Sequence, residues 1–241
     1  IARGYNQGGF NLNLGLDPNS ENSNLYYDPE FLTNYEIGFN SKIEELNLNL
    51  AAVIFHSDRK DQQVLISTQV DLNDPNTFTF LTQNAAEGTN NGIELEMDFQ
   101  LSGNLDMFIN FGLLKTEIKS WKSRPEIEGR AQAHAPEKSY AIGFNWYPTE
   151  RSSLSFDMVG KSSFYYSDSH DNKSKSYFLT NINYSYFYGQ WTYSIWGRNI
   201  FDEYYSTRGF YFGNEAPNFI DTLYERHGDP RHLGVTVRYD F

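Results

Sequence analysis

Apolar and polar residues alternate along many segments of this chain, and the alternation continues to its last residue. In the final segment, apolar side chains stand at Leu233, Val235, Val237, Tyr239 and Phe241, with polar residues or glycine between them. A period of two predicts a β-strand, because successive side chains of a strand point to opposite faces. No segment shows a capped apolar stripe of helical period, so the sequence predicts an all-β protein. The same alternation recurs in 34–40, 46–50, 93–101, 105–113, 140–146 and 182–186.

The connections between the expected strands are of two kinds, short and long, and the two kinds alternate strictly. We expect about ten antiparallel strands that run up and down. Outer-membrane β-barrels have short turns at one end and long loops at the other, so the pattern is typical of such a barrel. The short links are 41–45, 102–104, 148–152 and 188–190, and the long polar links are 11–30, 70–77, 120–137, 167–174 and 206–230.

Two architectures fit these strands, a sandwich of two sheets and a transmembrane barrel. In 93–101 the polar face carries Glu94, Glu96 and Asp98, which either architecture accommodates. Strand length favours the barrel, because the run from 46 to 67 is several times longer than the roughly 5–6 residues usual in globular sheets. Aromatic residues near strand ends, among them Trp146 and Trp191, fit the girdles at membrane surfaces. We therefore expect the apolar face to contact lipid.

The composition argues against several other classes of protein. The formal net charge of −12 disfavours a nucleic-acid binder. The absence of Cys removes disulfides, thiol nucleophiles and Cys-ligated metal sites. No nucleophile elbow, phosphate-binding loop or dinucleotide fingerprint occurs, so we expect neither an enzyme nor a cofactor. Asp168, His170 and Asp171 are of types that bind metal ions, but we expect a polar loop there and no metal site.

Five segments of the chain resemble, in the same order, segments of TonB-dependent outer-membrane receptors. The match extends over essentially the whole chain, but it corresponds only to the carboxyl-terminal part of such a receptor. The resemblance implies a 22-stranded barrel with an amino-terminal plug, in which these ten strands would be strands 13 to 22. We expect 1–241 to be one part of a longer receptor, without its plug and first strands. The five segments are Ala2–Asn11, Asp28–Lys42, Gly92–Glu96, Gly197–Tyr205 and Asp229–Phe241.

The resemblance also implies a function, a location and partners. It implies active uptake of a scarce ligand across the bacterial outer membrane, with a ferric siderophore favoured over haem, cobalamin or a carbohydrate. Energy would come from the TonB complex, which would act through the plug. The barrel-assembly machinery would recognise the terminal Phe241, and acidic loops could bind divalent ions that bridge lipopolysaccharide. An outer-membrane enzyme, a passive porin and a soluble carbohydrate-binding β-sandwich remain alternatives.

Ligand capture would fall to the long loops, which combine arginine with aromatic residues. A guanidinium group makes paired hydrogen bonds to carboxylate or catecholate oxygens and stacks on rings, and aromatic side chains supply contact area at a low entropic cost. For each single residue the competing explanation is an ordinary solvated or interfacial side chain. The candidates for ligand contact are Trp121, Arg124, Arg130, Tyr165, Tyr166, Arg208, Tyr211 and Arg226.

Overall fold

A computed structural model describes residues 1–11, 25–69, 78–122, 124–168, 170–213, 215–220 and 222–241. Fourteen strands and two short 3-10 helices make up the described part of the chain, which contains no helix long and apolar enough to cross a bilayer. The elements are β1 (Ala2–Asn6), β2 (Gly9–Phe10), β3 (Tyr26–Tyr27), β4 (Glu30–Ile43), η2 (Glu44–Leu46), β5 (Leu48–Gln69), β6 (Phe78–Ser102), β7 (Leu105–Trp121), η3 (Pro125–Ile127), β8 (Lys138–Thr149), β9 (Ser152–Lys161), β10 (Tyr177–Tyr188), β11 (Trp191–Arg198), β12 (Ser206–Phe212), β13 (Thr222–His227) and β14 (His232–Tyr239).

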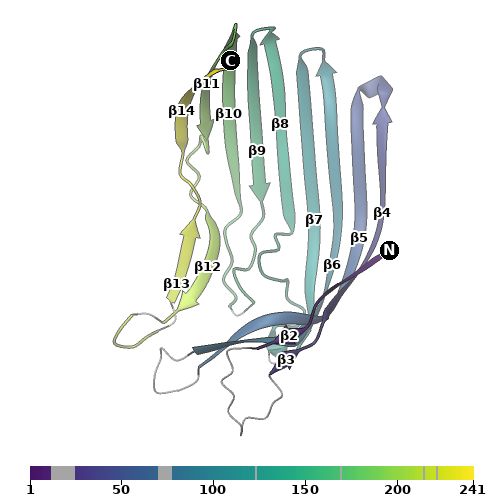
Figure 1. Cartoon of the computed structure of the whole chain (residues 1–241), viewed down its shortest axis with the longest axis vertical. Helices are drawn as coiled ribbons and strands as arrows, with labels where there is room; N and C mark the ends of the chain where they lie inside the picture. The colour runs from purple at the N-terminus through teal and green to yellow at the C-terminus, as the bar shows by residue number, and fades with distance from the viewer. Residues whose placement is uncertain (12–24, 70–77, 123, 169, 214, 221) are drawn as a thin grey trace.

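Ten of these strands form a single antiparallel sheet, as the sequence predicts. The order is β1-β4-β5-β6-β7-β8-β9-β10-β11-β14, and the strands lie side by side in one layer (Figure 1). Short turns join strands at one end, and those between β6 and β7, β8 and β9, and β10 and β11 each contain two residues. In the last of these, Gly189 has φ of +60°. The carboxyl terminus lies at this end, since Tyr239 of β14 pairs with Trp191 at the start of β11. The long connections leave from the opposite end.

The apolar sides of neighbouring strands lie in register and make one continuous face. Leu95 pairs with Ala52 on one side and Phe111 on the other, and Phe111 pairs with Tyr140. This face, which we call the outward face, exposes many large apolar side chains. The opposite, inward face carries Glu94 and Glu96 on the same strand. Exposed apolar residues of the outward face include Ile37, Phe39, Ile54, Ile93, Ile195, Leu233, Val235 and Val237.

The structure excludes the sandwich alternative and leaves the sheet open. The other two sheets have only two strands each, so none covers the apolar face of the ten-stranded sheet, and Val237 is 54% exposed. The sheet ends in two edges, β1 and β14, and does not close on itself. An outward apolar face and a polar inward face are the arrangement of a transmembrane barrel wall. Aromatic side chains of the outward face, including Trp146, Tyr186 and Trp191, lie near the short turns, as the girdle interpretation predicts.

Two parts of the fold differ from the expectation. The predicted link 206–230 contains the hairpin of β12 and β13, and the predicted link 11–30 contains β3, which pairs with β2 just before the link. β6 begins at Phe78, directly after the predicted link 70–77, although its clean alternation starts only at 93. The hairpin, the β2–β3 pair and the first part of β6 lack clean alternation because they lie beyond the apolar band of the outward face, which imposes it on the other strands. The predicted link 70–77, and 12–24 within the link 11–30, lie outside the described residues.

Candidate ligand-capture site

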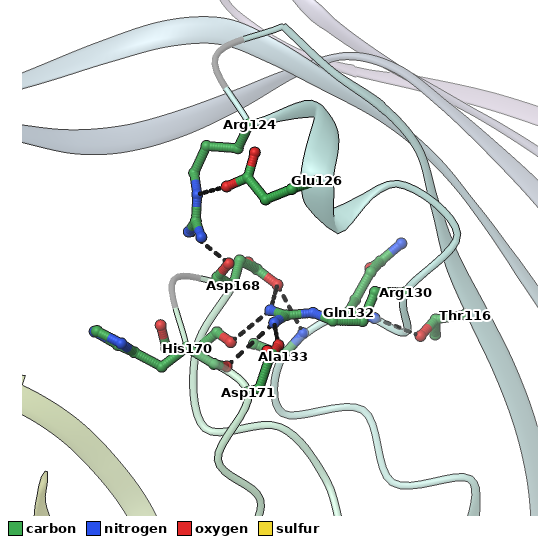
Figure 2. A network of polar contacts seen from close by, with 10 residues as sticks. Thr116, Arg124, Glu126, Arg130, Gln132, Ala133, Asp168, His170 and Asp171 are labelled. Atoms are coloured by element: carbon green, nitrogen blue, oxygen red, sulfur yellow. Dashed lines mark hydrogen bonds and ion pairs between the residues drawn. The ribbon is translucent and has the colours of Figure 1, made fainter.

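Arg130 joins the β7–β8 loop to the β9–β10 loop (Figure 2). Its Nη2 donates to the Ser167 carbonyl oxygen over 2.8 Å, and its Nη1 donates to Oδ1 of Asp171 over 2.7 Å. A second carboxylate, Asp168, lies 4.0 Å from the guanidinium group, whose side chain is only 10% exposed. A nearly buried guanidinium that meets several acceptors on another loop holds the two loops together. Arg130 therefore connects two segments that lie about forty residues apart in the chain.

Arg124 and Tyr165 strengthen the same junction. Nη1 of Arg124 donates to the Asp168 carbonyl oxygen over 2.7 Å, and its Nε donates to Glu126 over 3.0 Å (Figure 2). The Tyr165 ring lies 4.4 Å from the Arg130 guanidinium carbon and 4.1 Å from Nζ of Lys173. Such cation–ring contacts add about 0.5–1 kcal/mol each at exposed sites.

The β12–β13 hairpin packs its inner side on the β9–β10 loop. The Tyr166 hydroxyl donates a hydrogen bond to the Glu225 carboxylate. Gly209 lies opposite Glu225 in the hairpin, and a Cβ there would come within 2.5 Å of the Tyr166 ring, so the close approach requires glycine. Further along the same side, the Tyr211 and His170 rings lie 3.7 Å apart. The β7–β8 loop, the β9–β10 loop and the hairpin thus form one body, which we call the loop cluster.

The other side of the hairpin presents a pair of like charges. Arg208 of β12 lies directly opposite Arg226 of β13, and both are exposed. The next pair on that side is Phe210 and Tyr224, whose rings stack at 5.9 Å. Like charges directly opposite each other destabilise a hairpin. No carboxylate among the described residues forms an ion pair with either arginine, so this side is the part of the loop cluster best suited to an anion.

The structure places the eight candidate residues in two groups. Arg124, Arg130, Tyr165 and Tyr166 hold the loop cluster together, and Tyr166 is only 4% exposed. Trp121 is also only 4% exposed, and it packs in a small core with Ala86, Ile118 and Ile127. The exposed candidates on the hairpin are Arg208 and Arg226, while the Tyr211 ring lies against that of His170 at a tilt of 31°.

Among the residues that the structure describes, no group of three His, Cys, Asp or Glu side chains is arranged so that it could hold a metal ion. Asp168 accepts a hydrogen bond from the Ala133 backbone amide over 3.0 Å, and Asp171 accepts one from Arg130. The two carboxylates therefore serve the junction between the loops.

Asn199 is a structural residue of the site that the sequence reasoning did not single out. It adopts a left-handed backbone conformation, with φ of +47°, and is 4% exposed. Its side-chain amide donates to the carbonyl oxygens of Glu203 and Asp229 over 2.9 and 3.1 Å, and its Oδ1 accepts from the Glu203 backbone amide over 2.8 Å. Asn199 thus joins the chain leaving β11 to the chain entering β14 and fixes the base of the hairpin. The only sequence signal was its place in the motif Gly197–Tyr205.

The contact between Tyr166 and Glu225 responds to pH in both directions. The hydrogen bond from Tyr166 holds the pKa of the Glu225 carboxyl below its ordinary value of 4.5. Burial, and then the bond to Glu225, raise the pKa of Tyr166 from 10.0 to about 12. The contribution of the Glu225 carboxylate to docking of the hairpin is present above pH 4.5 and is lost as the pH falls through the lowered pKa of this group. The contribution of the Tyr166 phenol to the same docking is present below pH 10 and is lost as the pH rises toward about 12.

We therefore expect the hairpin to stay docked at neutral pH and to loosen at both extremes. Spin labels on cysteines placed at Asn172 and Thr222, both exposed, would report the distance from loop to hairpin. The distance distribution should be narrow near pH 7 and should broaden as the pH falls well below 4.5 and as it rises toward about 12. Tyr166→Phe keeps the ring and removes the donor, so it should broaden the distribution at neutral pH. A distribution that stays narrow in this variant would assign docking to ring packing alone.

The fold and the loop cluster define a class, the outer-membrane barrels that carry long, elaborated external loops. A family model for the TonB dependent receptor-like β-barrel matches residues 1–200. The chain belongs to the TonB-dependent receptor β-barrel family. Receptors of this family are transporters of the outer membrane and not enzymes.

Solved receptors share this fold at low sequence identity. The ferric yersiniabactin uptake receptor FyuA from Yersinia pestis has a TM-score of 0.76 at 18% identity, over 100% of this chain and 34% of its own. The siderophore receptor PiuA from Acinetobacter baumannii has a TM-score of 0.70 at 17% identity, over 90% of this chain and 29% of its own. The copper transporter OprC has a TM-score of 0.67 at 15% identity, over 89% of this chain and 32% of its own. The chain thus spans about a third of the length of these receptors.

Proposed function

We propose that these residues are the carboxyl-terminal part of the barrel of a longer receptor, which imports a scarce ligand with energy from the TonB system. The family and the open sheet support this proposal. Both edges, β1 and β14, carry backbone groups that a closed barrel would pair. The plug and the first strands would then belong to the rest of the receptor, and TonB would act through the plug. A mass near 27.9 kDa for the native protein would contradict the proposal.

A ferric siderophore is the ligand that the loop cluster supports best. The observation that carries this assignment is the exposed, directly opposed pair of Arg208 and Arg226 beside the stacked Phe210 and Tyr224. Two guanidinium groups bind oxyanions such as carboxylates and catecholates, and adjacent rings stack on the planar parts of a chelate. FyuA is a ferric yersiniabactin uptake receptor and PiuA is a siderophore receptor, whereas OprC is a copper transporter.

Uptake of labelled iron by cells under iron limitation tests both parts of the proposal. The probes are iron-55 complexes of one hydroxamate, one catecholate and one carboxylate siderophore. Deletion of the gene, or of TonB, should abolish uptake of at least one probe. Arg208→Gln with Arg226→Gln should reduce that uptake about tenfold at equal receptor levels. The control is Arg238→Gln, whose guanidinium pairs with Asp240 at the short-turn end.

The outcomes separate the competing functions. Uptake that survives loss of TonB would indicate a passive porin. Unchanged uptake of every probe after gene deletion would reject the siderophore assignment. Normal uptake in the double arginine variant would reject the hairpin as the capture surface while leaving the transport function standing.

We also propose that Phe241 belongs to the signal read by the barrel-assembly machinery. Phe241 is fully exposed, and its ring contacts that of Tyr239 at 5.0 Å, so it is accessible at the end of β14. Deletion of Phe241 should lower the amount of assembled receptor several-fold, measured by the heat-modifiable mobility of the folded barrel on gels. Phe241→Tyr, which keeps a terminal aromatic ring, should assemble normally. Unchanged surface levels after deletion would contradict the assignment.

A further inference from the structure

The inward face of the main sheet is divided by charge. Strands β4 to β9 contribute six carboxylates to this face, and we call their inward side the acidic sector. The strands β10, β11 and β14 contain no aspartate and no glutamate. The six carboxylates of the acidic sector are Glu36, Glu94, Glu96, Asp98, Asp106 and Asp157.

The carboxylates of the acidic sector keep their negative charge largely uncompensated. Among the described residues, no cation forms an ion pair with any of the six. Arg59 lies on the same face, but it pairs with Glu30. Lys42 and Lys161 also face inward, and the six carboxylates outnumber them. A wall with an excess of one sign of charge repels ions of that sign, so the acidic sector repels anions.

The inward side of β10, β11 and β14 carries hydroxyl groups instead, and we call it the hydroxyl sector. The hydroxyl oxygens of Ser185 and Ser194 lie 2.8 Å apart, and Nε1 of Trp196 donates to Oγ1 of Thr236 over 3.0 Å. The Trp196 ring lies over Gly234, where a Cβ would come within 2.2 Å of it, so this close approach requires glycine. The sector therefore offers neutral hydrogen-bonding groups beside an aromatic ring.

Arg198 gives the hydroxyl sector a positive charge at its long-loop end. Its guanidinium carbon lies 5.7 Å from the centre of the Trp196 ring, and no carboxylate among the described residues forms an ion pair with it. At the short-turn end, Arg238 is neutralised by Asp240, whose Oδ1 lies 2.6 Å from Nη2 of the arginine. The sector thus attracts an anion at one end and presents neutral groups along the rest of its length.

The hydroxyl sector continues directly from the candidate capture surface. Arg198 ends β11, and Asn199 after it fixes the base of the β12–β13 hairpin. Figure 1 shows this hairpin in line with β11 and β14. An anion that leaves Arg208 and Arg226 toward the short turns would therefore meet Arg198 first and then the hydroxyl of Ser194.

We propose that the hydroxyl sector is the wall along which an anionic ligand passes through the barrel, and that the acidic sector excludes the ligand from the other side. This inference rests on the proposed import of an anionic ligand. Hydroxyl groups donate hydrogen bonds to carboxylate and phenolate oxygens, whereas acidic side chains that line a pore select cations. Arg198 and Ser194 then determine specificity during passage, while Arg208 and Arg226 act in capture.

A carboxylate placed in the hydroxyl sector tests this inference in the full-length receptor. Ser194→Asp should lower the initial rate of labelled-iron uptake at least about tenfold at equal receptor levels, because it puts an anion in the path of the ligand. Binding of the same iron complex to cells that lack TonB should be unchanged, since the capture surface is intact. Ser194→Asn, which adds a neutral side chain of similar size, should import normally.

A matched variant in the acidic sector provides the control. Asn110 faces inward between Glu96 and Ala141, so Asn110→Asp adds one more carboxylate where the ligand does not pass and should leave uptake unchanged. Arg198→Gln should slow uptake several-fold without weakening binding, and Arg198→Lys should restore it. Normal uptake in Ser194→Asp, or an equal loss in Asn110→Asp, would overturn the inference.

Charged thiol reagents test the division of the wall without any knowledge of the ligand. Because residues 1–241 contain no cysteine, Ser194→Cys and Asn110→Cys each place one thiol at a chosen point of this wall. The probes are an anionic sulfonatoethyl and a cationic trimethylammonioethyl methanethiosulfonate, added to energised cells. The anionic reagent should be favoured over the cationic one about tenfold more at position 194 than at position 110.

The two experiments separate failure of this inference from failure of the proposed function. Equal reagent preference at the two positions would overturn the inference even in a receptor that imports iron. If the wild type imported none of the iron complexes, the proposed function would be rejected, and the reagent preference would decide the charge division by itself.

Discussion

Replacement of Trp121 by alanine should release the base of the β7–β8 loop. The indole is 4% exposed and packs with Ala86, Ile118 and Ile127, which are equally buried, and with Val64. Truncation of a buried tryptophan to alanine costs about 3–5 kcal/mol. The main sheet extends far from this small core, so the loss should appear as local opening and not as unfolding of the barrel.

Hydrogen exchange of the full-length receptor measures this opening. Backbone amides of the β7–β8 loop should exchange at least about a hundred times faster in Trp121→Ala, whereas amides of β8 to β11 should be unaffected. Trp121→Phe keeps most of the buried ring and should show a much smaller change. Normal exchange combined with weakened ligand uptake would instead make Trp121 a ligand contact.

Replacement of Leu95 by arginine should destabilise the barrel by about 2–4 kcal/mol, the cost of a basic side chain on the lipid face near the middle of the bilayer. Leu95 lies on the outward face between Ala52 and Phe111. Its neighbour Glu96 lies on the inward face between Ala51 and Asn110, so Glu96→Gln should be nearly neutral for folding.

Equilibrium unfolding of the full-length receptor from lipid vesicles would compare the two variants. Leu95→Met, which stays apolar, controls for the change of side-chain shape. Equal tolerance of Leu95→Arg and Glu96→Gln would mean that the two faces of β6 meet similar surroundings. That result would contradict our assignment that the apolar face contacts lipid.

The sequence predicted the wall of the barrel well, because lipid on one side and a polar interior on the other impose strict alternation on every strand. Positions such as Leu95 and Val237 therefore reveal their face without any structure. The prediction was poorer beyond the membrane. The β12–β13 hairpin and the first part of β6 have no apolar environment to satisfy, so their strands carry no clear period.

The loop residues were harder to place because residue type does not distinguish a ligand contact from a contact between loops. Arg130 and Arg208 look alike in the sequence, yet one is 10% exposed and meets two carboxylates, while the other is exposed and opposite a second arginine. The contacts of Arg130 join segments about forty residues apart, which no local pattern records. Asn199 was not predicted for a related reason, since its importance lies in one buried side chain that joins the segment after β11 to the segment before β14.

Because Arg130 connects two loops, it affects how loops can be exchanged between receptors. Its guanidinium in one loop depends on acceptors in the next, and that loop in turn contacts the hairpin through Tyr166. A single loop moved into another receptor would leave a nearly buried cation without its acceptors, or acceptors without their cation. Chimaeras that change ligand preference should therefore transplant all three segments as a matched set.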